Sequence, residues 1–225
     1  MASRKPFLTE RMRKKRISWC KEYAEKTEEF WNRVFFADET YIHVNMTGAM
    51  NRIRRYSSES RLSPRFTSST VKYPLKILIW GCFSSSGIGR LYISKQTMNS
   101  ERYLRTLENF LLPSFRDSEI TEPLFLDDSA PCHRSVKVQN FKNQKSIETL
   151  KWPGNSPDLN PIENVWSLLK RKVARIPNTT ERSLIENIIK VWNYGISKDY
   201  LQNLAKSMPK RIKEVLKAKG YPTKY

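Results

Sequence analysis

Three segments of the sequence each place a carboxylate beside an apolar run. They are VFFADET at residues 34–40, PLFLDD at residues 123–128 and KWPGNSPDLNPIENVW at residues 151–166. The first two read as buried strands that stop at Asp38 and Asp128, and the third leads into a helix that begins near Glu163. Two strands and a helix of this kind can bring the three carboxylates to one end of a sheet. Because carboxylate oxygens are ligands that hard divalent cations prefer, the pattern predicts a metal site.

The helix that carries Glu163 follows a loop made rigid by proline. Pro153, Pro157 and Pro161 prevent regular structure up to Asn160. Apolar residues then recur at helical spacings of four and three, at Ile162, Trp166, Leu169, Val173 and Ile176. We expect Asn160 to cap this helix and Pro161 to be its first residue, so that Glu163 lies in the first turn. A capping box between Asn160 and Glu163 is the simpler interpretation of Glu163 when it is considered alone.

Both candidate aspartates have an acidic neighbour in the sequence. Asp127 and Asp128 point to opposite faces of an alternating strand, but both faces are apolar, so periodicity does not choose between them. Glu39 follows Asp38, and we expect it to face away because neighbours on a strand alternate. Further along the chain, Asp158 most simply caps a turn.

The amino-acid composition indicates the class of molecule that the chain binds. With 41 Lys and Arg against 22 Asp and Glu, the chain of 225 residues carries a formal net charge of +19. An excess of this size is typical of a protein that binds a polyanion. No stretch approaches the roughly 18 apolar residues of a membrane span, residues 1–16 lack the apolar core of a signal peptide, and no aromatic RNA-binding motif of known type is present. The three widely spaced cysteines indicate a reducing compartment, and Cys132 beside His133 lacks the spacing of a structural zinc site.

The elements expected around the carboxylates alternate between strands and helices. Strands are expected at residues 34–38, 41–44 (as a hairpin partner of the first), 77–83, 90–93, 123–128 and 147–150, and helices at 100–112, 135–144, 161–176, 180–194, 198–207 and 209–219. Residues 45–73 have no clean period and read as a long excursion from the sheet. This succession predicts an α/β fold with a mixed sheet covered by helices on both faces.

Three motifs resemble the catalytic signatures of a known family. FADET, LDDSAPCH and WPGNSPDLNPIENVW are similar to those of the transposases of the Tc/mariner superfamily, and the 34 residues between Asp128 and Glu163 are typical of its Tc-like branch. The segment IWGCFSSSGIGRL and the closing GYPTKY also resemble that family, so that the resemblance covers residues 11–225. It implies a ribonuclease-H-like mixed sheet flanked by helices, with extra C-terminal helices. The match of DSAPCH to the family's DNAPCH favours Asp128 over Asp127.

The resemblance also implies an organisation in three parts. We expect a basic helical linker at residues 1–30, a ribonuclease-H-like catalytic core at 31–178 with the loop excursion 45–73, and C-terminal helices at 179–225 packed on the core. In the family, the linker joins N-terminal helix-turn-helix modules to the catalytic domain. Those modules do not appear in this sequence, which therefore reads as a fragment, a deliberate truncation or a shortened gene product. The basic run of the linker reads equally as a solvated helix face or a DNA contact, and residues 13–16 also resemble part of a nuclear-import signal.

The function implied is that of a DDE catalytic domain, a nuclear enzyme that cleaves DNA at element ends and joins it to target DNA. The resemblance implies two Mg²⁺ or Mn²⁺ ions, with Asp38 bridging them and Asp128 and Glu163 each completing the ligands of one ion. The implied partners are double-stranded DNA, as transposon ends and target, and a second copy of the chain in a homodimer.

Five residues are expected to contact DNA, and two alternatives to the implied function stay open. The expected DNA contacts are Arg52, Arg54, Arg55, His133 and Lys170. The resemblance also implies that His133 lies near the metals, with a structural hydrogen bond as an equal alternative. A disordered loop is an equal alternative for the region of the three arginines. A nuclease of the same fold and a non-catalytic DNA-binding protein derived from a transposase are alternatives to the enzyme as a whole.

Overall fold

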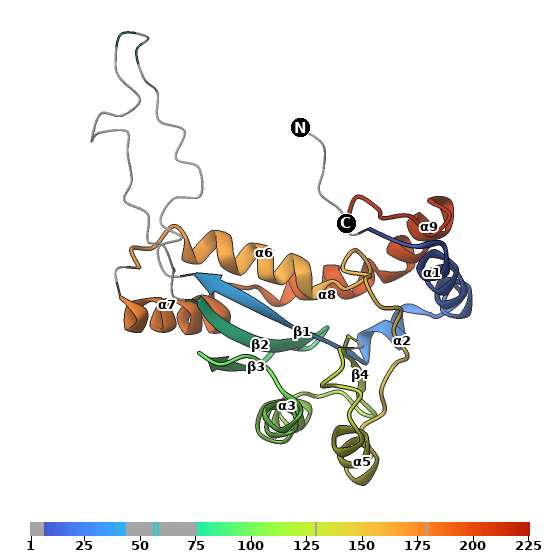
Figure 1. Ribbon diagram of the computed structural model, residues 1–225, viewed down its shortest axis with the longest axis horizontal. Coiled ribbons are helices and arrows are strands. Elements are labelled where there is room, and N and C mark those ends of the chain that lie inside the picture. Colours follow the sequence, from blue (N-terminus) through green and yellow to red (C-terminus); the bar gives the residue numbers. More distant parts are fainter. Residues whose placement is uncertain (1–6, 44–55, 57, 59–75, 129, 179) are drawn as a thin grey trace.

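Four strands form one mixed sheet in the order β3-β2-β1-β4 (Figure 1). They are β1 (Val34–His43), β2 (Lys76–Ser84), β3 (Gly87–Ser94) and β4 (Leu124–Leu126). β1 pairs antiparallel with β2 and parallel with β4, and β2 pairs antiparallel with β3. After the exposed Lys76, every residue of β2 is buried, as its continuous apolar run predicts for a strand at the centre of a sheet.

The computed structural model describes residues 7–43, 56, 58, 76–128, 130–178 and 180–225. The predicted excursion at 45–73 lies outside the described residues, apart from residues 56 and 58. The three arginines expected to contact DNA in that region, Arg52, Arg54 and Arg55, therefore also lie outside them.

The first strand is longer than its sequence pattern predicts. β1 continues past Asp38 to His43, so that the prediction of a separate hairpin partner at 41–44 was wrong. The continuation pairs residue by residue with the first part of β2, with Tyr41 opposite Leu78 and His43 opposite Lys76. A partner strand that distant in sequence supplies the hydrogen bonds that keep β1 extended.

Helices cover both faces of the sheet (Figure 1). The helices are α1 (Glu10–Glu22), α2 (Glu28–Asn32), α3 (Ser100–Thr106), α4 (Leu112–Arg116), α5 (Val136–Gln144), α6 (Ile162–Val173), α7 (Glu181–Tyr194), α8 (Lys198–Lys206) and α9 (Met208–Lys217), with a π-helical turn, η1 (Leu107–Leu111), between α3 and α4. Alternate residues of β1 face the two layers. Val34 and Phe36 pack in one apolar cluster with α6, α7, α8 and α9, and Phe35 and Ala37 pack in a second with α3, η1 and α5.

Several other predicted elements differ from the pattern in extent. The strand expected at 123–128 is limited to Leu124–Leu126, and that expected at 90–93 extends over Gly87–Ser94. The helix expected at 100–112 runs from Ser100 to Arg116 as α3, η1 and α4. The strand expected at 147–150 is a single parallel bridge between Phe125 and Thr149. The bridge is enclosed by hydrogen bonds of 2.8 Å from Phe125 N to Glu148 O and from Leu150 N to Phe125 O.

A glycine allows the helix that carries Glu163 to approach the central strands. Gly81 of β2 lies opposite Asp38 of β1 in the register. A Cβ atom at Gly81 would lie 2.7 Å from the Trp192 ring and 3.0 Å from the Trp166 ring, which is closer than a carbon atom tolerates. These two rings belong to α7 and α6 and stack at 5.2 Å. The absence of a side chain at Gly81 therefore lets both helices pack closely beside Asp38.

The helix nearest the start of the chain is part of the packed structure. α1 lies within residues 1–30, the range expected to be a linker, and it packs against α9 (Figure 1). Arg16, Trp19 and Cys20 on α1 are all buried. Within the part of the chain that the structure describes, no helix combines the length and the apolar character needed to cross a membrane.

Candidate active site

A cleft of about 490 Å³ contains the three predicted carboxylates. Asp38 comes from the middle of β1, Asp128 follows the end of β4, and Glu163 lies in the first turn of α6. The other lining residues are Glu39, Ala130, Pro131, Trp152, Gly154, Asn155, Ser156, Pro157 and Asn160. Segments separated by many residues in the sequence thus meet at one polar cleft, as the spacing of the motifs predicts.

The start of α6 is fixed to the strand that carries Asp38. The helix begins at Ile162, one residue later than predicted, with Pro161 in the N-cap position. The Asn160 side chain accepts a hydrogen bond from Ile162 N at 3.4 Å and donates one to the Ala37 carbonyl oxygen at 3.3 Å. The capping-box interpretation of Glu163 was therefore wrong, and Asn160 instead links the two segments that position Asp38 and Glu163.

The cleft concentrates negative charge. Burial raises the pKa of Asp38 well above its usual value, and the carboxylates of Glu39, Glu163 and Asp128 raise it further. Burial also raises the pKa of Glu163, against the opposing effects of Lys170 and of a hydrogen bond with Asp38. A bound cation would relieve this repulsion, so that the charge distribution favours one.

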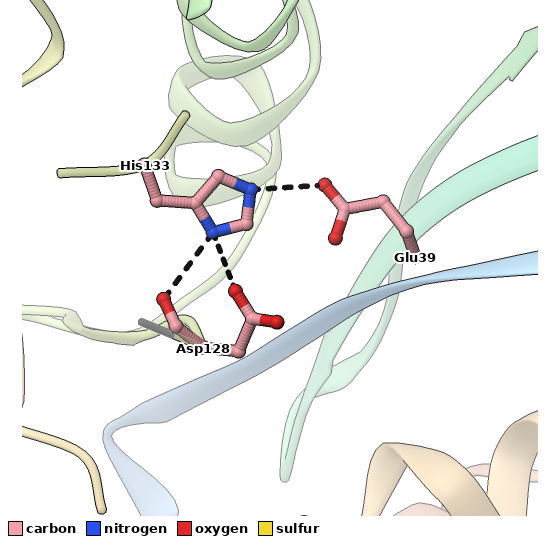
Figure 2. A group of neighbouring side chains, drawn as sticks. All are labelled: Glu39, Asp128 and His133. Atoms are coloured by element: carbon pink, nitrogen blue, oxygen red, sulfur yellow. Dashed lines mark hydrogen bonds and ion pairs between the residues drawn. The ribbon is translucent and has the colours of Figure 1, made fainter. Parts of the chain in front are cut away.

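His133 contacts both Asp128 and Glu39 (Figure 2). Its Nδ1 lies 2.7 Å from Asp128 Oδ1 and 3.2 Å from the Asp128 carbonyl oxygen, and its Nε2 lies 3.2 Å from Glu39 Oε1. Burial alone would lower the pKa of His133, but its hydrogen bonds to the two carboxylates outweigh burial and raise the pKa to about 11. The imidazolium therefore donates to both carboxylates. Burial would raise the pKa of Asp128, but His133 holds it below its usual value.

The prediction for Glu39 was wrong. Glu39 lies on the opposite face of β1 from Asp38 by strand alternation, but its side chain reaches His133 and lines the cleft, so it does not face away from the site. His133 is only 2% exposed, and its ring stacks on Tyr103 at 3.7 Å. It lies beside the carboxylates and hydrogen-bonds to them, and its contact with DNA stays a prediction.

Asp127 has a separate set of partners. Its Oδ2 accepts hydrogen bonds from the Tyr103 hydroxyl at 2.7 Å and from Lys142 Nζ at 2.6 Å. Both Asp127 and Lys142 are buried, and their ion pair balances the charge. Of the two adjacent aspartates, Asp128 is therefore the one that lines the cleft.

Lys170 is close enough to the carboxylates to act on them. Its Nζ donates a hydrogen bond to Thr40 Oγ1 at 2.6 Å. Burial lowers the pKa of Lys170, and the charges of Glu163 and Asp38 act in the opposite direction. The side chain is half-buried, and its contact with DNA stays a prediction.

Asp158 has a larger role than the turn cap that its sequence suggests. Arg16 binds both of its carboxylate oxygens, with Nη1 to Oδ1 at 2.8 Å and Nη2 to Oδ2 at 2.7 Å. Thr223 adds hydrogen bonds from its backbone N–H at 2.9 Å and its hydroxyl at 3.1 Å. Burial would raise the pKa of Asp158, but Arg16 and Thr223 hold it below its usual value. The prediction of a simple turn cap was wrong because its main partners are far away in the sequence.

The ligand atoms available in the cleft fit a hard divalent cation. Asp38, Asp128 and Glu163 offer oxygen atoms only, which suit Mg²⁺ or Mn²⁺. A second arrangement exists beside them, because Glu39, Asp128 and His133 have possible ligand atoms within 4.8 Å of one another. In that group the two ring nitrogens of His133 already contact carboxylates.

The sequence of this chain is similar to a family of endonucleases and to known transposases. Residues 33–185 match the family model described as DDE superfamily endonuclease. The chain is 33% identical over 223 residues to the Tcb1 transposase of Caenorhabditis briggsae, an alignment that covers 99% of this chain and 81% of that protein. It is 29% identical over 223 residues to the Tc1 transposase of Caenorhabditis elegans, with the same coverage.

Solved structures share the fold. The Mos1 transposase in a paired-end complex with the left transposon end has a TM-score of 0.81 at 20% identity, and the match covers 99% of this chain and 66% of that one. The chain thus spans about two thirds of the length of that protein. The catalytic domain of Mos1 mariner transposase has a TM-score of 0.75 at 18% identity, and the match covers 99% of this chain and all of that domain. These likenesses confirm the predicted ribonuclease-H-like fold.

Proposed function

This chain belongs to the DDE superfamily of endonucleases and is a transposase catalytic domain of the Tc1/mariner type, and from this premise we propose how its residues cleave and join DNA. The observation that carries the proposal is the meeting of Asp38, Asp128 and Glu163 in one cleft. They come from a strand, a loop and a helix. Burial raises the pKa of both Asp38 and Glu163, and the neighbouring carboxylates raise that of Asp38 further.

The three carboxylates are proposed to hold two Mg²⁺ or Mn²⁺ ions, with Asp38 shared between them. Structures of Mos1 with Mn and with Mg support the choice of cation. When bound, such cations stabilise the charge that develops on the attacking and leaving oxygens of a phosphodiester. The carboxylates of both Glu163 and Asp128 raise the pKa of Asp38, so the three lie close enough to act on one cation site.

Residues around the carboxylates keep them in place. His133 donates to Asp128 and Glu39, which limits the rotation of the Asp128 side chain. Lys170 places a positive charge near Glu163 and Asp38, where it attracts the phosphate backbone of DNA. Asn160 joins the start of α6 to β1 and so holds Glu163 beside Asp38.

The proposed chemistry has two steps of the same kind. In cleavage, a water oxygen bonds to phosphorus while the bond from phosphorus to the 3′ oxygen breaks, which leaves a 3′ hydroxyl and a 5′ phosphate. In joining, that 3′ hydroxyl bonds to a phosphorus of target DNA and displaces the 3′ oxygen there. Neither step requires a nucleophile from the protein, so the carboxylates alone account for the residues that the chemistry needs.

The proposed partners are double-stranded DNA, as transposon ends and target, and a second copy of the chain in the active complex. The charge of +19 supports a polyanionic partner, and one of the related structures is a paired-end complex with a transposon end. A nuclear location is also part of the proposal. It is supported by the exposed basic side chains Arg11, Lys14 and Lys15 on α1, and the location of a fluorescent fusion tests it.

Nicking and joining of DNA test the activity. The chain is incubated at low salt with supercoiled plasmid and with pre-cut oligonucleotide duplexes, in Mg²⁺ or Mn²⁺ and in a chelator. We expect Asp128→Asn to lose more activity than the roughly 100-fold that loss of an outer-shell partner costs. Asp117→Asn makes the same chemical change at an exposed carboxylate that lies outside the cleft and forms an ion pair with Arg90. This variant is expected to keep full activity.

The products distinguish the enzyme from its alternatives. Joined products that depend on the cation support the transposase reaction, whereas nicked plasmid without joined products supports a nuclease of the same fold. Equal product from the wild-type chain and Asp128→Asn would contradict the carboxylate mechanism.

A further inference from the structure

Arg211 on α9 is a buried arginine whose guanidinium group is fully engaged. It is only 1% exposed. Nε donates to Ser207 Oγ at 2.8 Å, Nη1 to the Asp158 carbonyl oxygen at 2.8 Å, and Nη2 to Asn164 Oδ1 at 2.6 Å. The Tyr225 ring lies 4.5 Å from the guanidinium carbon. A buried cation with this many partners has a specific position in the fold.

Two of these partners lie on either side of Glu163 in the sequence. Asp158 belongs to the proline-rich loop that precedes α6, and Asn164 directly follows Glu163 on the helix. Arg211 therefore bridges the loop before Glu163 and the first turn that carries it. Because the fork of a guanidinium group is planar and rigid, its two Nη atoms set the distance between these segments.

Arg16 and the C-terminal residues hold the Asp158 end of this bridge. Arg16 is buried on α1 and donates to both Asp158 carboxylate oxygens and, from Nε at 3.0 Å, to the Gly220 carbonyl oxygen. Thr223 donates to Asp158 Oδ2 from its backbone and its hydroxyl. The loop is thus held through Asp158 by both ends of the described chain.

The first turn of α6 needs such support. Glu163 lies among carboxylates of the same charge, and the Asn160 side chain gives the N–H groups of its turn one long hydrogen bond, of 3.4 Å. Outside the bridge, Tyr200 contributes a hydrogen bond of 3.3 Å from its hydroxyl to the Asn164 carbonyl oxygen.

We propose that Arg211 is a positioning residue for Glu163, which acts through Asn164 and Asp158 to set the place of this carboxylate in the metal site. The proposal rests on the metal-dependent function proposed above. It assigns a role in the reaction to a residue of α9 that does not line the cleft.

The test distinguishes an effect on the position of Glu163 from an effect on the stability of the fold. It does so by changing Asn164, which is only half-buried. Asn164→Ala removes the acceptor of Arg211 Nη2 and keeps a residue that favours helix. Asn164→Asp keeps an oxygen acceptor for Arg211. Asn178→Ala is the matched control, because Asn178 donates to the Val173 and Ile176 carbonyl oxygens at the other end of α6, at 2.8 and 2.6 Å.

The readout is the midpoint of thermal unfolding, measured while Mn²⁺ alone is titrated. This readout does not depend on activity. We expect Asn164→Ala to raise the half-saturating Mn²⁺ concentration by about tenfold, the lower end of the effect of outer-shell partners. Asn164→Asp is expected to restore the wild-type concentration. Asn178→Ala is expected to lower the unfolding midpoint without changing the Mn²⁺ concentration. Arg211→Lys, which keeps the charge but loses the fork, is expected to resemble Asn164→Ala.

A Glu163→Gln variant distinguishes failure of this proposal from failure of the proposed function. If Glu163→Gln binds Mn²⁺ as the wild-type chain does, the metal site itself is contradicted. If Glu163→Gln binds more weakly but Asn164→Ala does not, only the positioning role of Arg211 is overturned. Weakened binding in Asn164→Asp equal to that in Asn164→Ala would also overturn it, because the acceptor would then be irrelevant.

Discussion

Two groups of charged side chains, one buried and one half-buried, lie at the two ends of one loop, and they are built in opposite ways. In the paired cluster, Asp158 lies between Arg16 and Arg211, and both guanidinium groups bond to it directly. In the acidic cluster, Asp38 and Glu163 face each other beside Asp128, and their nearby cation, Lys170, is shared between two of them. The loop from Asp158 to Glu163 connects the clusters.

The difference shows how the fold supports an unfavourable site. Opposite charges that are buried together stabilise their arrangement once all are paired, whereas like charges that are buried together oppose it. The paired cluster holds the loop rigidly, so that the acidic cluster can keep its carboxylates close despite their repulsion. The paired cluster therefore supplies stability, and the neighbouring acidic cluster supplies reactivity.

Removal of a cation from the paired cluster is expected to have the largest effect on stability. Arg16→Met leaves the Asp158 carboxylate buried without its main partner, which costs about 3–5 kcal/mol of the free energy of unfolding. Lys14→Met is the matched control on the same helix, because Lys14 pairs with Glu10 at an exposed site and such pairs contribute up to about 1 kcal/mol. Urea unfolding followed by tryptophan fluorescence measures both. Equal losses in the two variants would show that burial of the pair has no energetic consequence.

Addition of a cation to the acidic cluster is expected to have the next largest effect. Mg²⁺ or Mn²⁺ at 100 times its dissociation constant should stabilise the folded chain by about 2.7 kcal/mol, and a chelator should reverse the gain. Asp38→Asn should lose this gain, because it removes the shared ligand, whereas Lys14→Met should keep it. The unfolding midpoint with and without the cation measures the effect. A gain that persists in Asp38→Asn would place the bound cation elsewhere.

The pH dependence of the cation-free chain should show the smallest effect and opposite signs in the two clusters. The pKa of Asp38 is raised in the folded state, so its stabilising contribution is present below its unfolded pKa and is lost as pH rises through the folded pKa. Asp38→Asn stays neutral, and it should exceed the wild-type stability at neutral pH by up to about 1 kcal/mol, the scale of one screened charge pair.

Asp158 should behave in the reverse manner. Its pKa is lowered in the folded state, so its contribution is present above its unfolded pKa and is lost as pH falls through the folded pKa. Asp158→Asn should therefore be less stable than the wild-type chain at neutral pH, with a difference that closes in acid. Urea midpoints of both variants, measured from acid to neutral pH, give the two slopes. Slopes of the same sign would remove the distinction between the clusters.

The local pattern of the sequence was sufficient for most of the fold. The apolar spacing from Ile162 predicted α6, and the buried residues Ile162, Trp166, Leu169 and Val173 confirm the predicted face. Helices α7, α8 and α9 also lie where their periodicity places them. The hairpin expected at 41–44 was wrong because the extent of β1 depends on pairing with β2, which local periodicity does not report.

The residues of the candidate site that lie in recognisable motifs could be predicted from the sequence. Asp38, Asp128 and Glu163 could be selected from the sequence, and the structure brings them to one cleft. The partners of the neighbouring acids could not be selected, because Asp158 is paired with a residue 142 positions away and Asp127 with one 15 positions away. Only the fold decides which charges meet. Glu39 was misjudged because strand alternation gives a direction but not the reach of a long side chain.

The burial of Arg16 has a consequence for the order of folding. Arg16 lies near the start of the chain, but its partners Asp158 and Gly220 follow 142 and 204 positions later. Contacts between such distant residues form late, because a long stretch of chain must first lose its conformational freedom. During synthesis α1 leaves the ribosome before these partners, so its guanidinium group has to wait until Gly220 has emerged. The loop that leads to Glu163 therefore gains its full support only after Gly220 has been translated.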